Sequence, residues 1–134
     1  MNKKVMIGAI AAILVLAGIY FGYQKVDDNK ISGGSLEITH ELGIAKISPN
    51  PQKVVVFDYG TLDTLDELGI PVAGVAKASL PNYLSKYENE KYTDIGTLFE
   101  PNFEVLAKLA PDLILISGRQ QTQYDVLTAI AATI

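Results

Sequence analysis

The chain has 134 residues, of which 49% are hydrophobic, a length that suits one domain with a modest core. It contains no cysteine, which excludes disulfides, thiolate metal sites and a cysteine nucleophile. From residue 26 onward, 8 Lys and Arg stand against 15 Asp and Glu, a formal charge of −7 that argues against nucleic-acid binding.

The N-terminal segment, residues 1–23, predicts a membrane anchor. Lys3 and Lys4 precede nineteen uncharged residues, which is close to the shortest run that spans a bilayer as a helix. The positive-inside rule places the N-terminus in the cytoplasm and the remaining chain on the outer face of the membrane. A cleaved secretion signal is the alternative, because the basic start fits a signal peptide as well. Leu16-Ala17-Gly18 resembles the start of a lipoprotein cleavage motif, but Ile19 replaces the cysteine that would be acylated.

A polar linker and a small hairpin follow the anchor. Residues 24–35 have the Ser- and Gly-containing composition of a flexible linker, and the domain is expected to occupy residues 36–134. Apolar and polar residues alternate on both sides of Gly43, which predicts a β-hairpin. His40, the only histidine, belongs to this hairpin, so we expect it to be a packed or surface residue rather than a metal ligand.

Residues 54–75 predict one βαβ unit. The apolar run Val54–Phe57 is typical of a strand buried on both faces of a parallel sheet. A tight turn follows, with Thr61 as the expected helix N-cap, and the helix ends at Gly69. Val72–Val75 predicts the second strand. The apolar stripe of the helix would consist of Leu62, Leu65 and Leu68.

The rest of the chain repeats this alternation. The expected fold class is therefore α/β, with an open parallel sheet and flanking helices. The expected elements are an irregular stretch or short helix over 77–92 with a charged, exposed part at 86–91, a strand end at 93–96, a helix after Pro101, a buried strand over 113–116, a turn at 117–119, a helix over 123–131 and a strand beginning at 133.

The carboxyl ends of the strands are where open parallel sheets bind ligands. Arg119, the only arginine, follows one such strand and suits an anionic oxygen ligand, because its guanidinium can donate two parallel hydrogen bonds. It could equally be a surface arginine. Tyr59, Tyr83 and Tyr87 could line a pocket for an aromatic ligand, or they could simply cover the domain.

An enzymatic interpretation centres on Asp58. The segment Val55–Leu62 resembles the first motif of haloacid dehalogenase-like phosphatases, in which a strand ends in an aspartate nucleophile. Those enzymes need a second carboxylate two residues later as the general acid, and Gly60 stands there. The sequence also lacks glycine-rich nucleotide motifs and metal-ligand spacings, so we expect no catalytic residue, metal site or cofactor.

Six segments in order resemble the siderophore-binding proteins of ABC importers, most closely the catecholate branch of Gram-positive bacteria. They are Ile38–Gly43, Pro51–Asp58, Leu62–Ile70, Leu80–Leu84, Gly96–Glu104 and Pro111–Arg119. The resemblance implies two α/β lobes joined by a long helix, of which this chain covers only the N-terminal lobe. It also implies that the siderophore itself holds the iron, so the protein needs no metal ligand.

The same resemblance assigns roles to single residues. Arg119 matches an arginine of the first lobe that contacts the anionic ferric catecholate, and Glu104 matches a carboxylate that docks on the permease. Lys77 would add positive charge. The expected function is thus that of a monomeric, membrane-tethered component that binds a ferric siderophore and delivers it to an ABC permease, and a truncated remnant that binds nothing is the alternative. The wall of the site would be shaped by Tyr59, Gly60 and Tyr83.

Overall fold

A computed structural model describes residues 34–134 of the chain. The predicted anchor and all but the last two residues of the predicted linker lie outside this range. Within residues 34–134, no helix has both the length and the apolar character that crossing a membrane requires.

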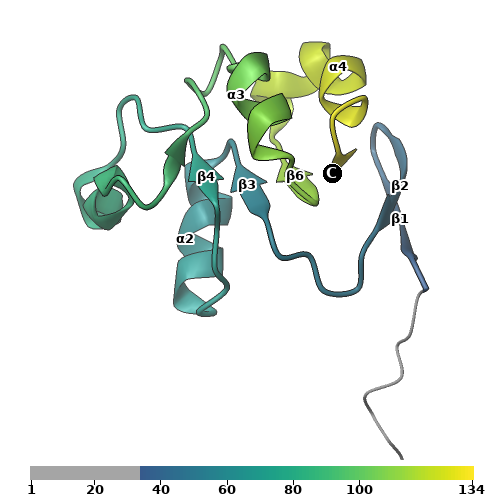
Figure 1. Ribbon diagram of the computed structural model, residues 1–134, viewed down its shortest axis with the longest axis horizontal. Helices are drawn as coiled ribbons and strands as arrows, with labels where there is room; N and C mark the ends of the chain where they lie inside the picture. Colours follow the sequence, from purple (N-terminus) through teal and green to yellow (C-terminus); the bar gives the residue numbers. More distant parts are fainter. Residues whose placement is uncertain (1–33) are drawn as a thin grey trace, which may run out of the picture. The chain divides into compact units, whose positions relative to one another are not determined.

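Twelve elements follow one another in this range, and they are drawn along the chain in Figure 1. They are β1 (Leu36–His40), β2 (Gly43–Ile47), β3 (Val54–Val56), α2 (Tyr59–Glu67), β4 (Gly74–Val75), the 3₁₀ helix η1 (Asn82–Glu88), β5 (Thr93–Asp94), α3 (Phe103–Leu109), β6 (Leu113–Leu115), the 3₁₀ helix η2 (Gly118–Gln123), α4 (Tyr124–Thr128) and β7 (Ala132–Thr133).

A five-stranded parallel sheet forms the centre of the domain. Its strand order is β5-β4-β3-β6-β7, and every neighbouring pair is parallel. The hairpin β1–β2 is a separate antiparallel sheet, in which Leu36 pairs with Ile47 and His40 pairs with Gly43. The predicted α/β fold with an open parallel sheet, the βαβ unit and the hairpin are thereby confirmed.

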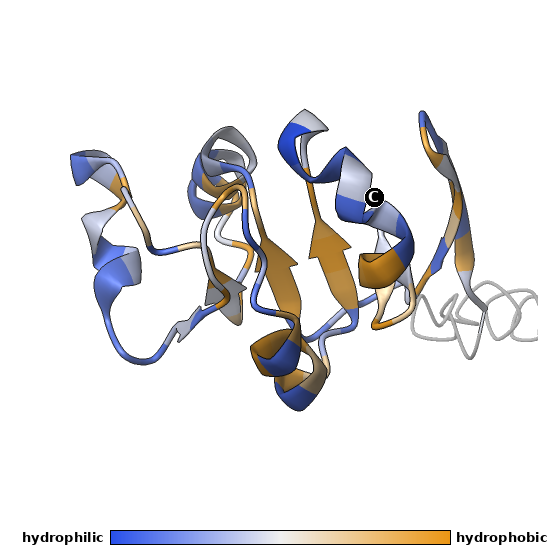
Figure 2. Cartoon of the chain, turned by 90° about the horizontal axis from the view of Figure 1, so that it is seen from above, coloured by the Kyte–Doolittle hydropathy of each residue, from blue (hydrophilic) through white to orange (hydrophobic). Residues whose placement is uncertain are grey.

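Helices cover both faces of the sheet because the strand residues alternate in direction. Val54 and Val56 belong to the apolar cluster that contains Leu62 of α2. Val55 belongs to the cluster on the opposite face, which contains Leu106 of α3 and Leu127 of α4. Figure 1 accordingly shows α2 on one side of the sheet and α3 and α4 on the other. The central strands are coloured hydrophobic in Figure 2, as expected for strands buried on both faces.

Three details differ from the sequence predictions. The N-cap of α2 is Asp58 and not Thr61, because the Asp58 carboxylate accepts a 2.8 Å hydrogen bond from the Thr61 backbone N–H. Leu68 is 67% exposed, because it is the C-cap of α2 and no longer follows the buried stripe. The third helix begins five residues earlier than predicted, as the 3₁₀ helix η2, and continues as α4 only to Thr128.

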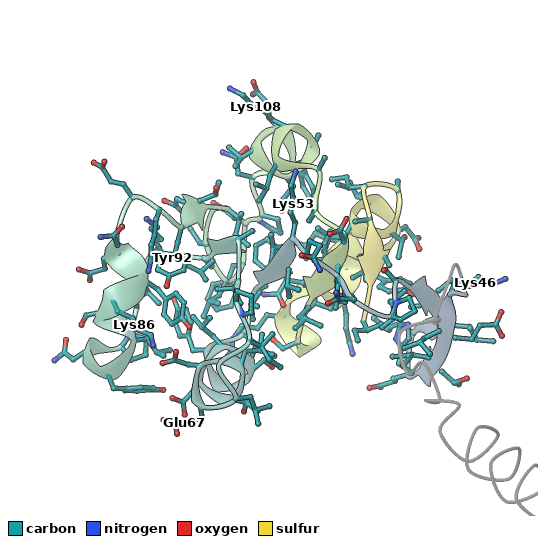
Figure 3. All side chains as sticks on the ribbon, turned by 60° about the horizontal axis from the view of Figure 1, so that its bottom comes forward. Lys46, Lys53, Glu67, Lys86, Tyr92 and Lys108 are labelled. Atoms are coloured by element: carbon teal, nitrogen blue, oxygen red, sulfur yellow. The ribbon has the colours of Figure 1, made fainter. Side chains whose placement is uncertain are left out.

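The charged stretch between β4 and β5 contributes to the core. Its 3₁₀ helix η1 buries Leu84 and Tyr87, which are three residues apart and therefore on one face. Figure 3 shows the labelled Lys46, Glu67 and Lys108 pointing outward. The predicted exposure of Lys86 to Lys91 was wrong at Tyr87, which is 3% exposed because it lies on the same face as Leu84.

Candidate ligand-binding site

The loops after β3 and β6 bring two opposite charges together at the carboxyl edge of the sheet. A guanidinium nitrogen of Arg119 lies 3.8 Å from the Asp58 carboxylate. The Arg119 side chain is 48% exposed and that of Asp58 is 25% exposed. An ion pair as open as this contributes about 0–1 kcal/mol to stability, so Arg119 stays available to another anion.

Asp58 holds the turn from β3 into α2. One carboxylate oxygen accepts hydrogen bonds from the Thr61 backbone N–H at 2.8 Å and from the Thr61 hydroxyl at 3.1 Å. Its other oxygen is the one nearest to Arg119. A Cβ at Gly60 would come within 3.2 Å of the Asp58 carboxylate, so glycine keeps this turn uncrowded. These contacts make Asp58 a helix cap and a partner of Arg119.

Tyr59 fixes the neighbouring loop after β4. Its hydroxyl donates to the backbone carbonyls of Ala76, at 3.2 Å, and of Ala78. Burial and, second, the negative charge of Asp94 raise the pKa of Tyr59 above its usual value. The tyrosine is therefore a neutral donor that ties α2 to the end of β4, and its predicted place in the wall of a ligand site stays a prediction.

Lys77 begins at the same edge, but its ammonium group points into η1. It donates to the carbonyl oxygens of Glu88 at 3.0 Å and Asn89 at 2.9 Å. It thus satisfies carbonyl groups at the C-terminal end of the 3₁₀ helix, where a cation is favourable. Its predicted role as a cation for the ligand stays a prediction.

A buried amide fixes the segment that carries Arg119. Gln120 is fully buried, and its side-chain oxygen accepts a 2.9 Å hydrogen bond from the Ser117 backbone N–H. Its side-chain nitrogen donates to the carbonyl of Leu98 and, at 3.5 Å, to that of Phe57. One side chain therefore joins the ends of β3 and β6 to the loop after β5.

The loop after β5 presents an aromatic ring at this edge. Phe99 is 65% exposed, and the Arg119 guanidinium lies 6.0 Å from the centre of its ring. Beside the ring is a hollow of about 380 Å³. It is lined by Ala78, Ser79, Thr97, Leu98, Phe99 and Glu100.

Two other predicted functional residues lie apart from the pair of charges. Tyr83 is in η1 and is 65% exposed, with no hydrogen bond of its side chain to residues 34–134. Glu104 lies in the first turn of α3, where it is exposed to solvent and favourably placed for the helix dipole. Both keep their predicted roles as predictions, because exposure alone assigns neither.

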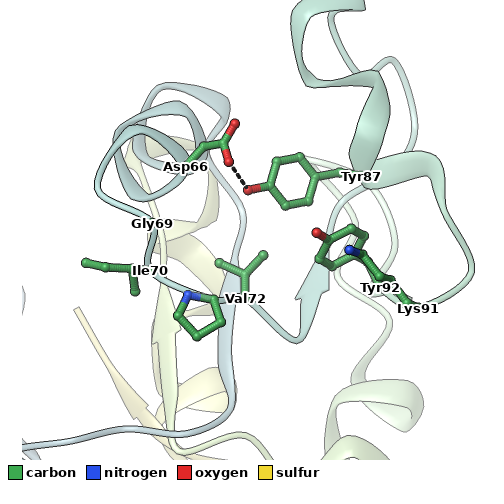
Figure 4. Close-up of a pocket in the computed structure, with 8 residues that line it drawn as sticks. Asp66, Gly69, Ile70, Val72, Tyr87, Lys91 and Tyr92 are labelled. Atoms are coloured by element: carbon green, nitrogen blue, oxygen red, sulfur yellow. Dashed lines mark hydrogen bonds between the residues drawn. The ribbon is translucent and has the colours of Figure 1, made fainter.

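A second hollow, of about 360 Å³, lies at the opposite edge of the sheet (Figure 4). The Tyr87 hydroxyl donates to the Asp66 carboxylate at 3.1 Å, and Lys86 pairs with the same carboxylate. The hydrogen bond from Lys86 is the main cause of the lowered pKa of Asp66. Burial, followed by the bond to Asp66, raises the pKa of Tyr87 to about 12. This network joins η1 to α2.

His40 has a structural partner in α4. The Tyr124 hydroxyl lies 3.3 Å from the His40 ring nitrogen Nε2, and the two rings meet edge to face. This contact agrees with the predicted packed histidine of the hairpin. Among residues 34–134, no three His, Asp or Glu side chains gather in a way that could hold a metal ion.

Residues 54–134 match the family model described as Periplasmic binding protein. The chain belongs to this family. The petrobactin-binding protein YclQ of Bacillus subtilis is 44% identical over 133 residues, an alignment that covers 96% of this chain and 41% of YclQ. This chain thus spans about two fifths of the length of that relative.

Solved structures agree with the family assignment. The crystal structure of YclQ matches with a TM-score of 0.73 and 50% identity, over 75% of this chain and 36% of YclQ. The catecholate-siderophore binding protein VctP of Vibrio cholerae matches with a TM-score of 0.70 and 42% identity, over the same shares. PiuA of Streptococcus pneumoniae, an iron uptake ABC transporter substrate-binding protein, matches with a TM-score of 0.68 and 35% identity, over 74% and 35%.

Gln120 and Phe99 lie at this edge and were not among the predicted site residues. Ser117 and Gln120 have the Ser-x-x-Gln spacing of a capping box, a signal that could have placed a helix start there and drawn attention to Gln120. Phe99 lies in a loop after a parallel strand, and the rule that such loops carry the ligand could have included it.

Proposed function

We propose that this chain forms the first lobe of a siderophore-binding component of an ABC importer, which binds a ferric catecholate outside the cell and hands it to the permease. The main observation behind this proposal is that Arg119 is exposed beside Asp58 at the carboxyl edge of the sheet. The chain also belongs to a family of binding proteins. The names of YclQ, VctP and PiuA support siderophore binding and ABC transport for relatives that are longer than this chain.

The chemistry of the cargo supports this assignment. A ferric tris-catecholate is a trianion in which the siderophore satisfies the iron, so the protein has only to match negative oxygens and flat aryl rings. A guanidinium pairs with such oxygens in the plane of its fork. Glu104, exposed on α3, is our candidate for the contact with the permease. The predicted anchor would hold the protein, as a monomer, at the outer face of the membrane.

Catalysis by Asp58 is the weaker proposal. Its carboxylate accepts two hydrogen bonds from Thr61 and faces Arg119, and Gly60 supplies no second acid. We therefore propose a protein that binds and does not catalyse. Turnover of a phosphate ester with magnesium that is lost in Asp58→Asn would contradict this.

Titration with a ferric tris-catecholate tests the proposed function. The chain has seven tyrosines and no tryptophan, so quenching of tyrosine fluorescence reports binding. In a protein that also carries a second lobe, Arg119→Ala should cost roughly 2–4 kcal/mol of binding free energy, and Arg119→Lys should recover part of it. Lys108→Ala, which removes an equal charge from exposed α3, is the control and should bind normally. Arg119→Ala with wild-type affinity would refute the assigned site.

A further inference from the structure

The loop that carries Phe99 is held in place along most of its length. The Thr97 hydroxyl oxygen accepts hydrogen bonds from the backbone N–H groups of Phe99 at 3.1 Å and Glu100 at 2.9 Å. The Thr97 N–H donates to the Glu100 carbonyl at 3.0 Å, and Gly96 bridges to Pro101. The loop therefore closes on itself and fixes the backbone from which the ring projects.

Two glutamines of η2 tie this loop to the segment of Arg119. Gln120 donates to the carbonyl of Leu98, and Gln123 donates to the carbonyl of Phe99 at 3.4 Å. The ring and the guanidinium, which lie 6.0 Å apart, thus rest on one hydrogen-bonded frame. An exposed phenylalanine alone is no evidence of a binding site. Here the loop that carries it is already fixed by hydrogen bonds, so a ligand that contacts the ring would not have to order the loop first.

The hollow beside the Phe99 ring is better suited to an uncharged aryl group than to an anionic one. The adjoining hollow, about 380 Å³, is at the lower end of the size range of small-molecule pockets. Its wall combines Ala78 and Leu98 with the exposed carboxylate of Glu100, so an anionic group would be repelled there and an uncharged aryl edge would not. The anionic oxygens of the same ligand would then face Arg119.

We propose that Phe99 is a specificity-determining residue, whose ring stacks on an aryl ring of the bound catecholate while Arg119 pairs with that ligand's oxygens. This inference rests on the proposed function and deepens it, because a stacking ring would let the edge distinguish aryl siderophores from carboxylate ones of similar charge. Offset stacking of two rings adds a moderate contribution beyond the area that they bury.

The test uses diamagnetic gallium(III) complexes and the full 134-residue chain. A tris-catecholate and a citrate complex are titrated into the wild type, Phe99→Tyr and Phe99→Leu, and proton NMR follows the ligand. In the wild type, the ring current of Phe99 should shift the catecholate aryl protons upfield. Phe99→Leu should abolish that shift and weaken catecholate binding about three- to tenfold, whereas Phe99→Tyr should preserve both. Citrate binding should change less than twofold in either variant.

Controls separate the possible outcomes. Leu68→Ala removes another exposed apolar side chain at the far end of α2 and should leave both titrations unchanged. An amide spectrum like that of the wild type verifies that each variant is folded. Equal losses for catecholate and citrate in Phe99→Leu, or an upfield shift that persists there, would overturn the stacking role alone. Because one lobe is expected to bind weakly, the titrations extend to millimolar ligand, and a wild-type chain that binds neither complex there would overturn the proposed function, and the stacking role with it.

Discussion

Tyr87 is the residue whose environment changes its chemistry most clearly. Burial and the hydrogen bond to Asp66 raise its pKa to about 12 in the folded protein, against 10.0 for an ordinary tyrosine. The folded state therefore holds the phenolic proton more tightly than the unfolded state does. The stability that this provides is fully present below pH 10 and is lost as the pH rises through about 12.

Alkaline titration checks this prediction. Tyrosinate absorbance should contain a late component that titrates near pH 12 and disappears in Tyr87→Phe. Tyr83→Phe is the matched control, because Tyr83 is 65% exposed and its removal should leave the late component in place. A late component that survives in Tyr87→Phe would show that another tyrosine carries it.

At the scale of elements, η2 depends on one buried amide. Gln120→Ala would leave the carbonyl of Leu98 and the backbone N–H of Ser117 without their partner. Losing partners for buried polar groups costs about 1–3 kcal/mol, so we expect a loss of that size in the free energy of unfolding. Urea denaturation measures it. Gln121→Ala, one residue further along the same helix and exposed, should change stability by less than about 0.5 kcal/mol. Equal effects of the two substitutions would contradict the role of the amide.

The sequence predicted the buried strands better than it predicted the helix caps or the buried glutamine. The strands β3 and β6 were predictable because unbroken apolar runs require burial on both faces. Cap positions were less predictable, since Asp58 and Thr61 are both good N-caps and only the backbone geometry chooses between them. The buried position of Gln120 was hidden, because its partners Leu98 and Phe57 lie 22 and 63 residues away in the chain.

At the scale of the whole molecule, the proposed function gives this chain only one wall of a cleft. A ligand on the edge that carries Arg119 would remain largely in water, where charge pairs are weak and screened by salt. We therefore expect the 134-residue chain to bind a ferric tris-catecholate orders of magnitude more weakly than a version with a second lobe. Titrations of both forms at low and high salt measure the difference, and the single lobe should lose most of its affinity at high salt. Equally tight, salt-independent binding by both forms would refute this.

The pairing of Arg119 with Asp58 also has a consequence for selectivity outside the cell. An incoming anion would compete with Asp58 for the guanidinium, which lies 3.8 Å from the carboxylate. An exposed pair of this kind is worth at most about 1 kcal/mol, which corresponds to roughly a fivefold handicap. That handicap weighs heavily on chloride or phosphate, which offer little else in return. In the proposed function it is small for a trianion that brings several contacts, so the edge would discriminate against abundant small ions and still admit a ferric catecholate.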